Sequence, residues 1–167
     1  MKRNLLILSL FLFSITQANC QKFKNIRIIE PEFSGTSVFV NDSIGSGVLL
    51  EQQTATMEEG IVTLKYAVKV CCSTVFADTI NSEFIVRVSD NSINPYDVLS
   101  IVKTKIENNK RTWKFSNPET VEFKAKKYGT SSYIISIPRF PLGQYGIYFK
   151  KNNSISLFGV KLIKNNS

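Results

Sequence analysis

The chain contains no histidine among its 167 residues. Histidine is the side chain that most often acts as a general base near neutral pH, and it is also a common metal ligand. A Ser-His-Asp or Cys-His catalytic site is therefore impossible. A serine–lysine pair stays open, but the most hydroxyl-rich segment, residues 129–132, has no lysine that the pattern marks as its partner. We expect a protein without a cofactor that acts by binding, not by catalysis.

Cysteine is also scarce, since the chain has only Cys20, Cys71 and Cys72. Three cysteines do not make a disulfide-dense scaffold. On a strand the adjacent pair would point to opposite faces, and a zinc site there would lack further ligands and the usual spacing. A bridge from Cys20 to Cys71 or to Cys72 remains open, and we expect no metal at the pair.

Helical periodicity is missing as well, and residues 52–60 could hold one helical turn at most. The dominant period is two, as in half-buried strands. The clearest run, residues 61–70, places one set of apolar side chains on one side: Val62, Leu64, Tyr66, Val68 and Val70. In residues 155–163 the alternation shifts phase, which predicts a β-bulge near residues 157–159.

Turn-forming residues separate these short runs at fairly even spacing. Many short strands of this kind predict an all-β fold, an antiparallel β-sandwich of immunoglobulin-like or jelly-roll-like type with about 8–10 strands. There is no internal repeat and no linker long enough to divide the chain. We therefore expect a single domain over residues 19–167.

The N-terminus has the pattern of a secretory signal peptide. Lys2 and Arg3 precede a mainly apolar run over residues 5–15, and Thr16 and Ala18 fit the −3 and −1 positions of a cleavage site. The run is too short for a membrane anchor, so residues 1–18 are predicted to be removed, leaving no transmembrane segment. The expected location is secreted or periplasmic.

Cys20 allows a second interpretation of the leader. A cysteine just after an apolar leader can be the lipid-modified first residue of a bacterial lipoprotein. Residues 17–19 fit that pattern poorly, because it requires an aliphatic residue at −3. A lipid anchor at Cys20 is therefore the minority alternative.

Positive charge is unevenly distributed. The formal net charge is +8, and residues 103–127 hold eight basic residues against three acidic ones, together with the single tryptophan. A basic face with an aromatic side chain suits an acidic glycan or an envelope protein. Export and the absence of a binding module argue against nucleic acid. The candidate ligand-binding residues are Arg111, Trp113, Lys114, Lys124 and Lys126.

Carboxylates give weaker candidates. The loop between Asp90 and Asp97 is rich in oxygen ligands, which suits calcium, but it lacks EF-hand spacing and such residues also form turns. A carboxylate-dependent glycan hydrolase is an alternative function, because two acids facing each other across a cleft would suffice. Its candidates by position alone are Glu83, Asp90, Asp97 and Glu122. A structural envelope subunit that associates through strand edges is a further alternative.

Two segments carry a resemblance. Residues 83–91 (EFIVRVSDN), followed by Asn-Pro-Tyr-Asp at 94–97, and the C-terminal pair at 143–149 and 158–161 resemble small exported all-β domains of unknown function from Bacteroidetes-type bacteria. The resemblance covers about half of residues 19–167 and implies an envelope or secreted protein without catalytic residues. Gln144 and Lys161 stand where those domains tend to carry acids.

Two tripeptides resemble the O-glycosylation acceptor of such bacteria, Asp-Ser/Thr-aliphatic. They are Asp-Ser-Ile at 42–44 and Asp-Thr-Ile at 78–80. This resemblance predicts Ser43 and Thr79 as possible O-glycosylation sites.

Overall fold

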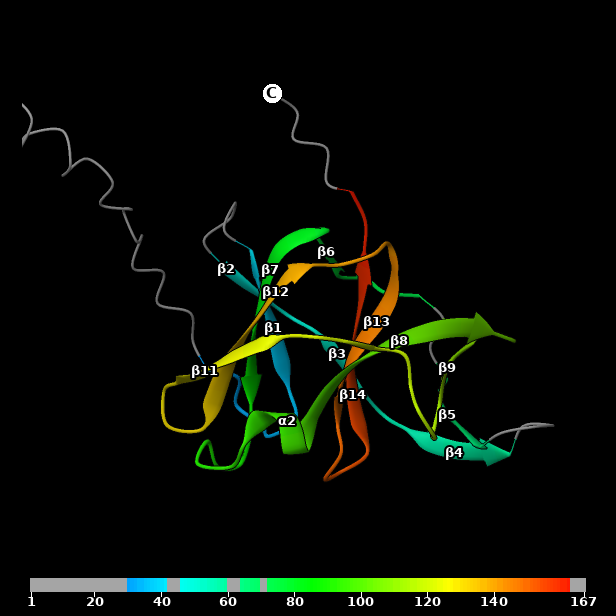
Figure 1. Cartoon of the computed structure of the whole chain (residues 1–167), viewed down its shortest axis with the longest axis horizontal. Helices are drawn as coiled ribbons and strands as arrows, with labels where there is room; N and C mark the ends of the chain where they lie inside the picture. Colours follow the sequence, from blue (N-terminus) through cyan, green and yellow to red (C-terminus); the bar gives the residue numbers. More distant parts are fainter. Residues whose placement is uncertain (1–29, 42–45, 60–63, 70–71, 163–167) are drawn as a thin grey trace, which may run out of the picture.

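The computed structural model describes residues 30–41, 46–59, 64–69 and 72–162. These residues form fourteen strands and one short helix, arranged as two antiparallel sheets (Figure 1). The predicted all-β antiparallel class is confirmed. The strands outnumber the 8–10 expected because some runs are interrupted. Residues 46–59, for example, are divided into three strands at Leu50 and Ala55, which are both buried.

The smaller sheet has five strands in the order β11-β12-β7-β1-β2. Its central strand β7 pairs with β1 on one side and β12 on the other. Its strands are β1 (Ser37–Asn41), β2 (Ser46–Leu49), β7 (Ile80–Arg87), β11 (Lys124–Tyr128) and β12 (Ser132–Arg139).

The larger sheet has nine strands in the order β3-β14-β13-β8-β9-β5-β4, with β10 beside β8 and β6 beside β14. Only the β6–β14 pair is parallel among the pairs described. Its strands are β3 (Glu51–Thr54), β4 (Thr56–Glu59), β5 (Leu64–Val68), β6 (Phe76–Ala77), β8 (Leu99–Glu107), β9 (Lys110–Lys114), β10 (Thr120–Val121), β13 (Gly143–Phe149) and β14 (Ser154–Val160).

The helix α2 (Pro95–Val98) lies just before β8. Asn94 caps it, accepting a hydrogen bond from the Tyr96 backbone N–H at 3.3 Å, and Pro95 occupies the first position, where its missing N–H costs nothing. Residues 52–59, where at most one helical turn was expected, belong mainly to β3 and β4.

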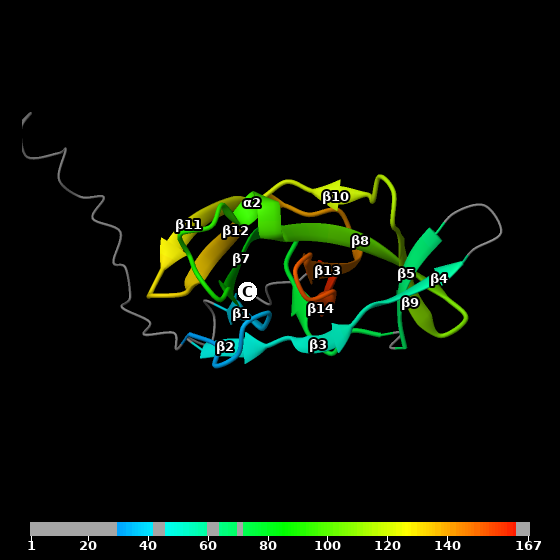
Figure 2. The same cartoon turned by 90° about the horizontal axis from the view of Figure 1, so that it is seen from below.

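The larger sheet buries side chains on both faces. One face packs on the smaller sheet through an apolar core that includes Phe84, Ile101, Ile147 and Phe158. The opposite face packs on the end of the same sheet. Strands β9, β5 and β4 lie at the end of the molecule far from the smaller sheet, and the sheet bends there (Figures 1 and 2). A second, smaller core lies there, formed by Ala55, Val68, Val102, Trp113, Tyr148, Ile155 and Leu157.

The two cores explain why the bulge expected at residues 157–159 is absent. β14 pairs with β13 in one unbroken register from Ser154 to Val160. Ile155 and Leu157 enter the smaller core, whereas Phe158 and Val160 enter the larger one. The apparent shift of phase therefore records two buried faces rather than an inserted residue.

Candidate functional site

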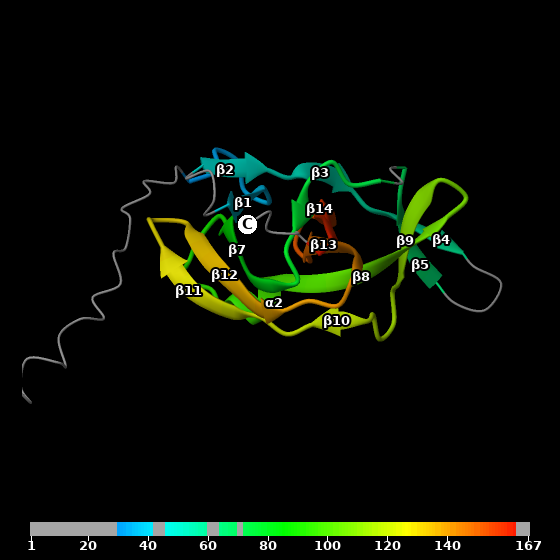
Figure 3. The same ribbon diagram turned by 90° about the horizontal axis from the view of Figure 1, so that it is seen from above.

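Strand β8 contributes two lysines to the candidate site, because its second half extends past the smaller sheet. Leu99 and Ile101 point into the larger core, and two residues further on the same face carries Lys103 and then the exposed Lys105. Figure 3 shows β8 extending from α2 toward β9, away from the smaller sheet. The same face of β8 therefore packs in the apolar core in the first half of the strand and carries charged side chains in the second half.

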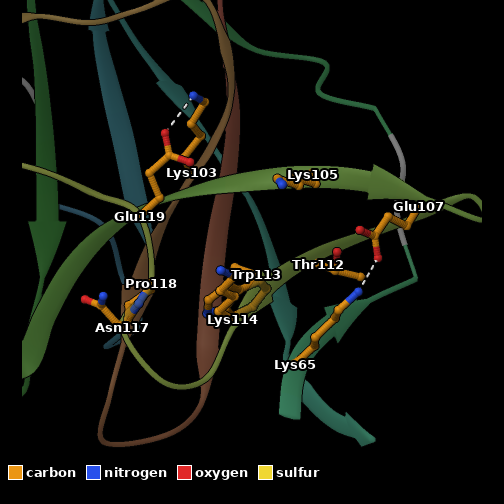
Figure 4. A pocket seen from close by; sticks show the side chains of 10 residues that line it. All are labelled: Lys65, Lys103, Lys105, Glu107, Thr112, Trp113, Lys114, Asn117, Pro118 and Glu119. Carbon is orange, nitrogen blue, oxygen red and sulfur yellow. Dashed lines mark hydrogen bonds and ion pairs between the residues drawn. The ribbon is translucent and has the colours of Figure 1, made fainter. Parts of the chain in front are cut away.

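A pocket opens where β8 changes its neighbour. β8 pairs with β9 from Lys105 to Glu107 and with β10 at Ile101 and Val102. Between these two pairings the chain leaves β9 and returns through residues 115–119, where Asn117 has a left-handed backbone (φ 53°) that asparagine tolerates well. The resulting pocket of about 440 Å³ is lined by residues of β5, β8, β9 and this loop (Figure 4).

Lysines dominate the lining. We call this site the lysine groove and define it by Lys65, Lys103, Lys105 and Lys114, with Trp113 also in the wall. Two glutamates offset part of the charge, since Lys65 pairs with Glu107 and Lys103 with Glu119, both at 2.8 Å. Among the described residues, Lys105 and Lys114 have no ion-pair partner. The lining carries a net formal charge of +2, because four lysines face two glutamates.

Both glutamates of the groove are held as carboxylates. The hydrogen bond from Lys65 lowers the pKa of Glu107, and the hydrogen bond from Lys103 lowers the pKa of Glu119. The same contact with Glu119 raises the pKa of Lys103. A glycosidase acid needs a raised pKa so that it can donate a proton. The pKa shifts of Glu107 and Glu119 are therefore opposite in direction to the shift that a glycosidase acid requires.

Two of the predicted ligand-binding residues are buried. Arg111 is 0 % exposed and Trp113 is 5 % exposed. The guanidinium of Arg111 donates to Gln144 Oε1 at 2.5 Å, to the Tyr145 backbone oxygen at 3.2 Å and to the Ser73 hydroxyl. Strand alternation directs Arg111 inward on the face that carries Val68 and Trp113, so its part in ligand binding stays a prediction.

Trp113 has a mixed position. Its ring stacks on Tyr66 with centroids 5.4 Å apart and contacts Tyr148 edge-on, so it mainly supports the smaller core. It also contributes to the wall of the lysine groove. Of the five predicted ligand-binding residues, only Trp113 and the exposed Lys114 therefore line this pocket.

Lys124 and Lys126 are exposed but lie elsewhere. They belong to β11, the edge strand of the smaller sheet, at the opposite end of the molecule from β9 (Figures 1 and 2). β11 and the strand that carries Lys103, β8, belong to different sheets, so these lysines do not form one continuous basic face. Lysines on an edge strand have a separate role available, since they discourage pairing with another chain.

The carboxylate candidates are dispersed. Asp90 lies in the β7–α2 loop and accepts two hydrogen bonds from Ser92, while Asp97 lies within α2. Glu83 on β7 accepts a hydrogen bond from Ser136 at 2.8 Å, and Glu122 lies between β10 and β11. Within the described residues no group of three or more His, Cys, Asp or Glu side chains converges on a metal site.

Other predictions fall partly outside the described residues. The leader (residues 1–18), Cys20, Ser43 and Cys71 all lie there, so the signal peptide, the cysteine pairing and one acceptor site stay predictions. Thr79 is half-buried in the loop between β6 and β7, where its hydroxyl donates to Asp78 Oδ1 at 3.1 Å. Cys72 is exposed.

Sequence reasoning missed Lys65 and did not count Lys103 or Lys105 among the candidates. Lys65 lies far from the basic window in the chain, and only the pairing of β5 with β9 brings it there. The available signal was its place on the polar face of the alternating run at residues 61–70. Lys103 and Lys105 lie in the basic window, but which strands lie beside them depends on the order of strands in the sheet.

Comparisons with known proteins leave the site to be interpreted from its geometry alone. No helix in the described residues is both long and apolar enough to span a bilayer. The resemblance to exported bacterial domains stays a prediction. Searches against protein families, curated proteins and solved structures find no match to this chain.

Proposed function

We propose that this chain is an exported β-sandwich protein that binds an acidic glycan through the lysine groove, without catalysing a reaction. The observation that carries the proposal is the convergence of four lysines from three strands on one pocket. Lys105 and Lys114 bring charges that no described carboxylate neutralises. Ammonium groups without internal partners favour anions arriving from solvent.

The fold supports binding in a second way. The three strands of the groove each contribute a side chain to the smaller core, namely Val68, Val102 and Trp113, so its lysines start from a rigid platform. Thr112, which lies between Lys110 and Lys114 on β9, is buried. The ion pair between Lys65 on β5 and Glu107 on β8 crosses over β9, which lies between these two strands. A rigid site loses less conformational freedom when a ligand binds.

The test compares two double variants of equal charge. Lys105→Glu with Lys114→Glu changes the groove, and Lys124→Glu with Lys126→Glu makes the same charge change on β11. Binding of polygalacturonate, dextran sulfate and neutral dextran is measured by calorimetry at increasing salt. We expect the groove variant to bind the acidic polymers at least about tenfold more weakly, because local charge controls the interaction, and the β11 variant to change by less than about threefold.

Several results would contradict the proposal. Equal losses in the two variants would indicate a response to net charge and not to the groove. Undiminished binding at high salt, or equal binding of neutral dextran, would exclude an electrostatic site. Circular dichroism of both variants checks that the fold is retained. Mass spectrometry of the native N-terminus tests export, with cleavage after Ala18 expected and an intact leader contradicting it.

A further inference from the structure

A second pocket lies at the end of the sandwich, away from the lysine groove. It has a volume of about 260 Å³ and lies between the β7–α2 loop, α2 and the β13–β14 hairpin. In Figure 1 α2 and this hairpin lie together at the lower edge of the molecule. The apolar part of the lining is Val88, Ile93, Val98 and Phe149, so the pocket opens onto the margin of the larger core.

The walls of this pocket are fixed by hydrogen bonds. The buried Tyr133 shares its hydroxyl proton between the backbone oxygens of Ile93 and Asn91, the latter at 2.6 Å, and so holds the loop. The Lys150 backbone N–H donates to the Val98 oxygen at 3.0 Å, joining the hairpin to α2. A pocket whose walls are already held in place is typical of small-molecule sites.

The rim carries one charge of each sign. Asp90 accepts from the Ser92 backbone N–H at 2.8 Å and from the Ser92 hydroxyl at 2.7 Å, which uses two of the roughly four acceptor positions of a carboxylate. These bonds, together with the nearby charge of Lys127, lower the pKa of Asp90 and keep it ionised. Lys151 is exposed on the hairpin and has no ion-pair partner in the described part of the chain.

We infer that this pocket binds an apolar zwitterion of amino-acid size. The ligand's ammonium group would contact Asp90, its carboxylate would contact Lys151, and its hydrocarbon part would cover the four apolar side chains. The volume is slightly below the range of about 300–1,000 Å³ usual for drug-sized ligands, which limits the occupant to a small molecule. Charge complementarity selects the zwitterion, because a plain amine or acid would satisfy only one of the two rim groups.

The inference is tested with leucine and phenylalanine as probes on the whole protein, by calorimetry and by amide chemical shifts. Leucine methyl ester lacks the carboxylate and N-acetyl-leucine lacks the ammonium group, so each is expected to bind at least about tenfold more weakly than leucine. Glycine, which lacks the apolar part, is expected to bind weakly as well. Shifts should be confined to residues of the β7–α2 loop and the β13–β14 hairpin.

Variants assign each contact separately. Asp90→Asn should strongly weaken the binding of leucine but leave the residual binding of N-acetyl-leucine unchanged, because that probe has no ammonium group to contact Asp90. Lys151→Gln should also weaken the binding of leucine, but it should leave the residual binding of leucine methyl ester unchanged, because that probe has no carboxylate. Asp97→Asn and Lys124→Gln are matched controls outside the pocket and should leave leucine binding unchanged. Absence of shifts in this pocket at millimolar leucine, or equal loss in variants and controls, would overturn the inference. Acidic-polymer binding by Asp90→Asn should be retained, which separates this test from that of the lysine groove.

Discussion

Strand β8 has two halves that share one alternating pattern but differ in their surroundings. In the half beside β10, Ile101 and Val102 are buried on opposite faces, one in each core. In the half beside β9, Lys105 and Ile106 are both exposed. The difference arises because the larger sheet extends past the smaller one, so the outer part of β8 has no sheet stacked on it. The candidate binding surface is located at this overhang.

The largest expected effect comes from one isoleucine in each half. Ile101 is 0 % exposed and Ile106 is 50 % exposed on the same strand. Ile101→Ala should lower the free energy of unfolding by about 2–5 kcal/mol, because it leaves a cavity in the larger core. Ile106→Ala should change it by less than about 0.5 kcal/mol, as surface substitutions usually do. Urea unfolding measures both, and similar losses would mean that the two halves are buried alike.

A second prediction concerns the close contact opposite Val102. Gly146 pairs with Val102 across the β13–β8 ladder, and a Cβ at Gly146 would lie 2.3 Å from Ile155 Cδ1. Gly146→Ala should therefore cost about 1–3 kcal/mol through overpacking of the smaller core. Ile155→Ala removes both this atom and Ile155 Cγ1, which would lie 2.4 Å away, so Gly146→Ala should cost less in that background than in the parent. Strict additivity of the two substitutions in urea unfolding would contradict this contact.

A third prediction uses pH to compare the cores. Burial, and then the hydrogen bond with Tyr66, raises the pKa of Tyr148 in the smaller core, and burial raises the pKa of Tyr145 in the larger one. In the unfolded chain a tyrosine loses its proton near pH 10. Above that pH the unfolded state binds fewer protons than the folded state, so the free energy of unfolding should fall as pH rises.

The alkaline loss can be assigned to single tyrosines. At pH 7, Tyr148→Phe should cost about 0.5–1.5 kcal/mol, because it removes the hydrogen bond to Asn153 Oδ1. Above pH 10 the difference between variant and parent should narrow, since phenylalanine has no proton to lose. Urea unfolding at a series of pH values measures the difference. A constant gap from pH 7 to pH 11 would show that Tyr148 does not contribute to the alkaline loss.

Alternation was enough to predict the fold class and much of the strand pattern. The described part of the run at 61–70 forms β5, with Tyr66 and Val68 in or beside the smaller core. Alternation could not predict which element packs on each face of a strand, because a buried position is apolar whether another sheet or the same sheet covers it. For that reason the two-faced β14 was interpreted as a bulged strand.

The candidate site was predictable in composition but not in place. The basic window 103–127 contains much of the lysine groove, yet it also contains Lys124, which lies at the far end of the molecule. Sequence distance could not separate these groups, because the chain leaves β9, passes along β10 and then joins the other sheet. Lys65 enters the groove only through the order of strands in the sheet. Strand order depends on long-range packing, which local patterns do not encode.

The smallest expected effect is the most informative about the overhanging half. Lys114 lies directly opposite Lys65 on the neighbouring strand, and like charges in that position are unfavourable. Lys114→Thr should therefore raise the free energy of unfolding by about 0.2–1 kcal/mol relative to Lys105→Thr, whose position faces Thr112 instead. Both substitutions should weaken binding of an acidic polymer. A residue that lowers the stability of the fold but strengthens binding is typical of a functional site, because selection for stability alone would replace that residue. If Lys114→Thr destabilises the protein in urea unfolding, the lysine stabilises the strand pair and its position gives no argument for binding.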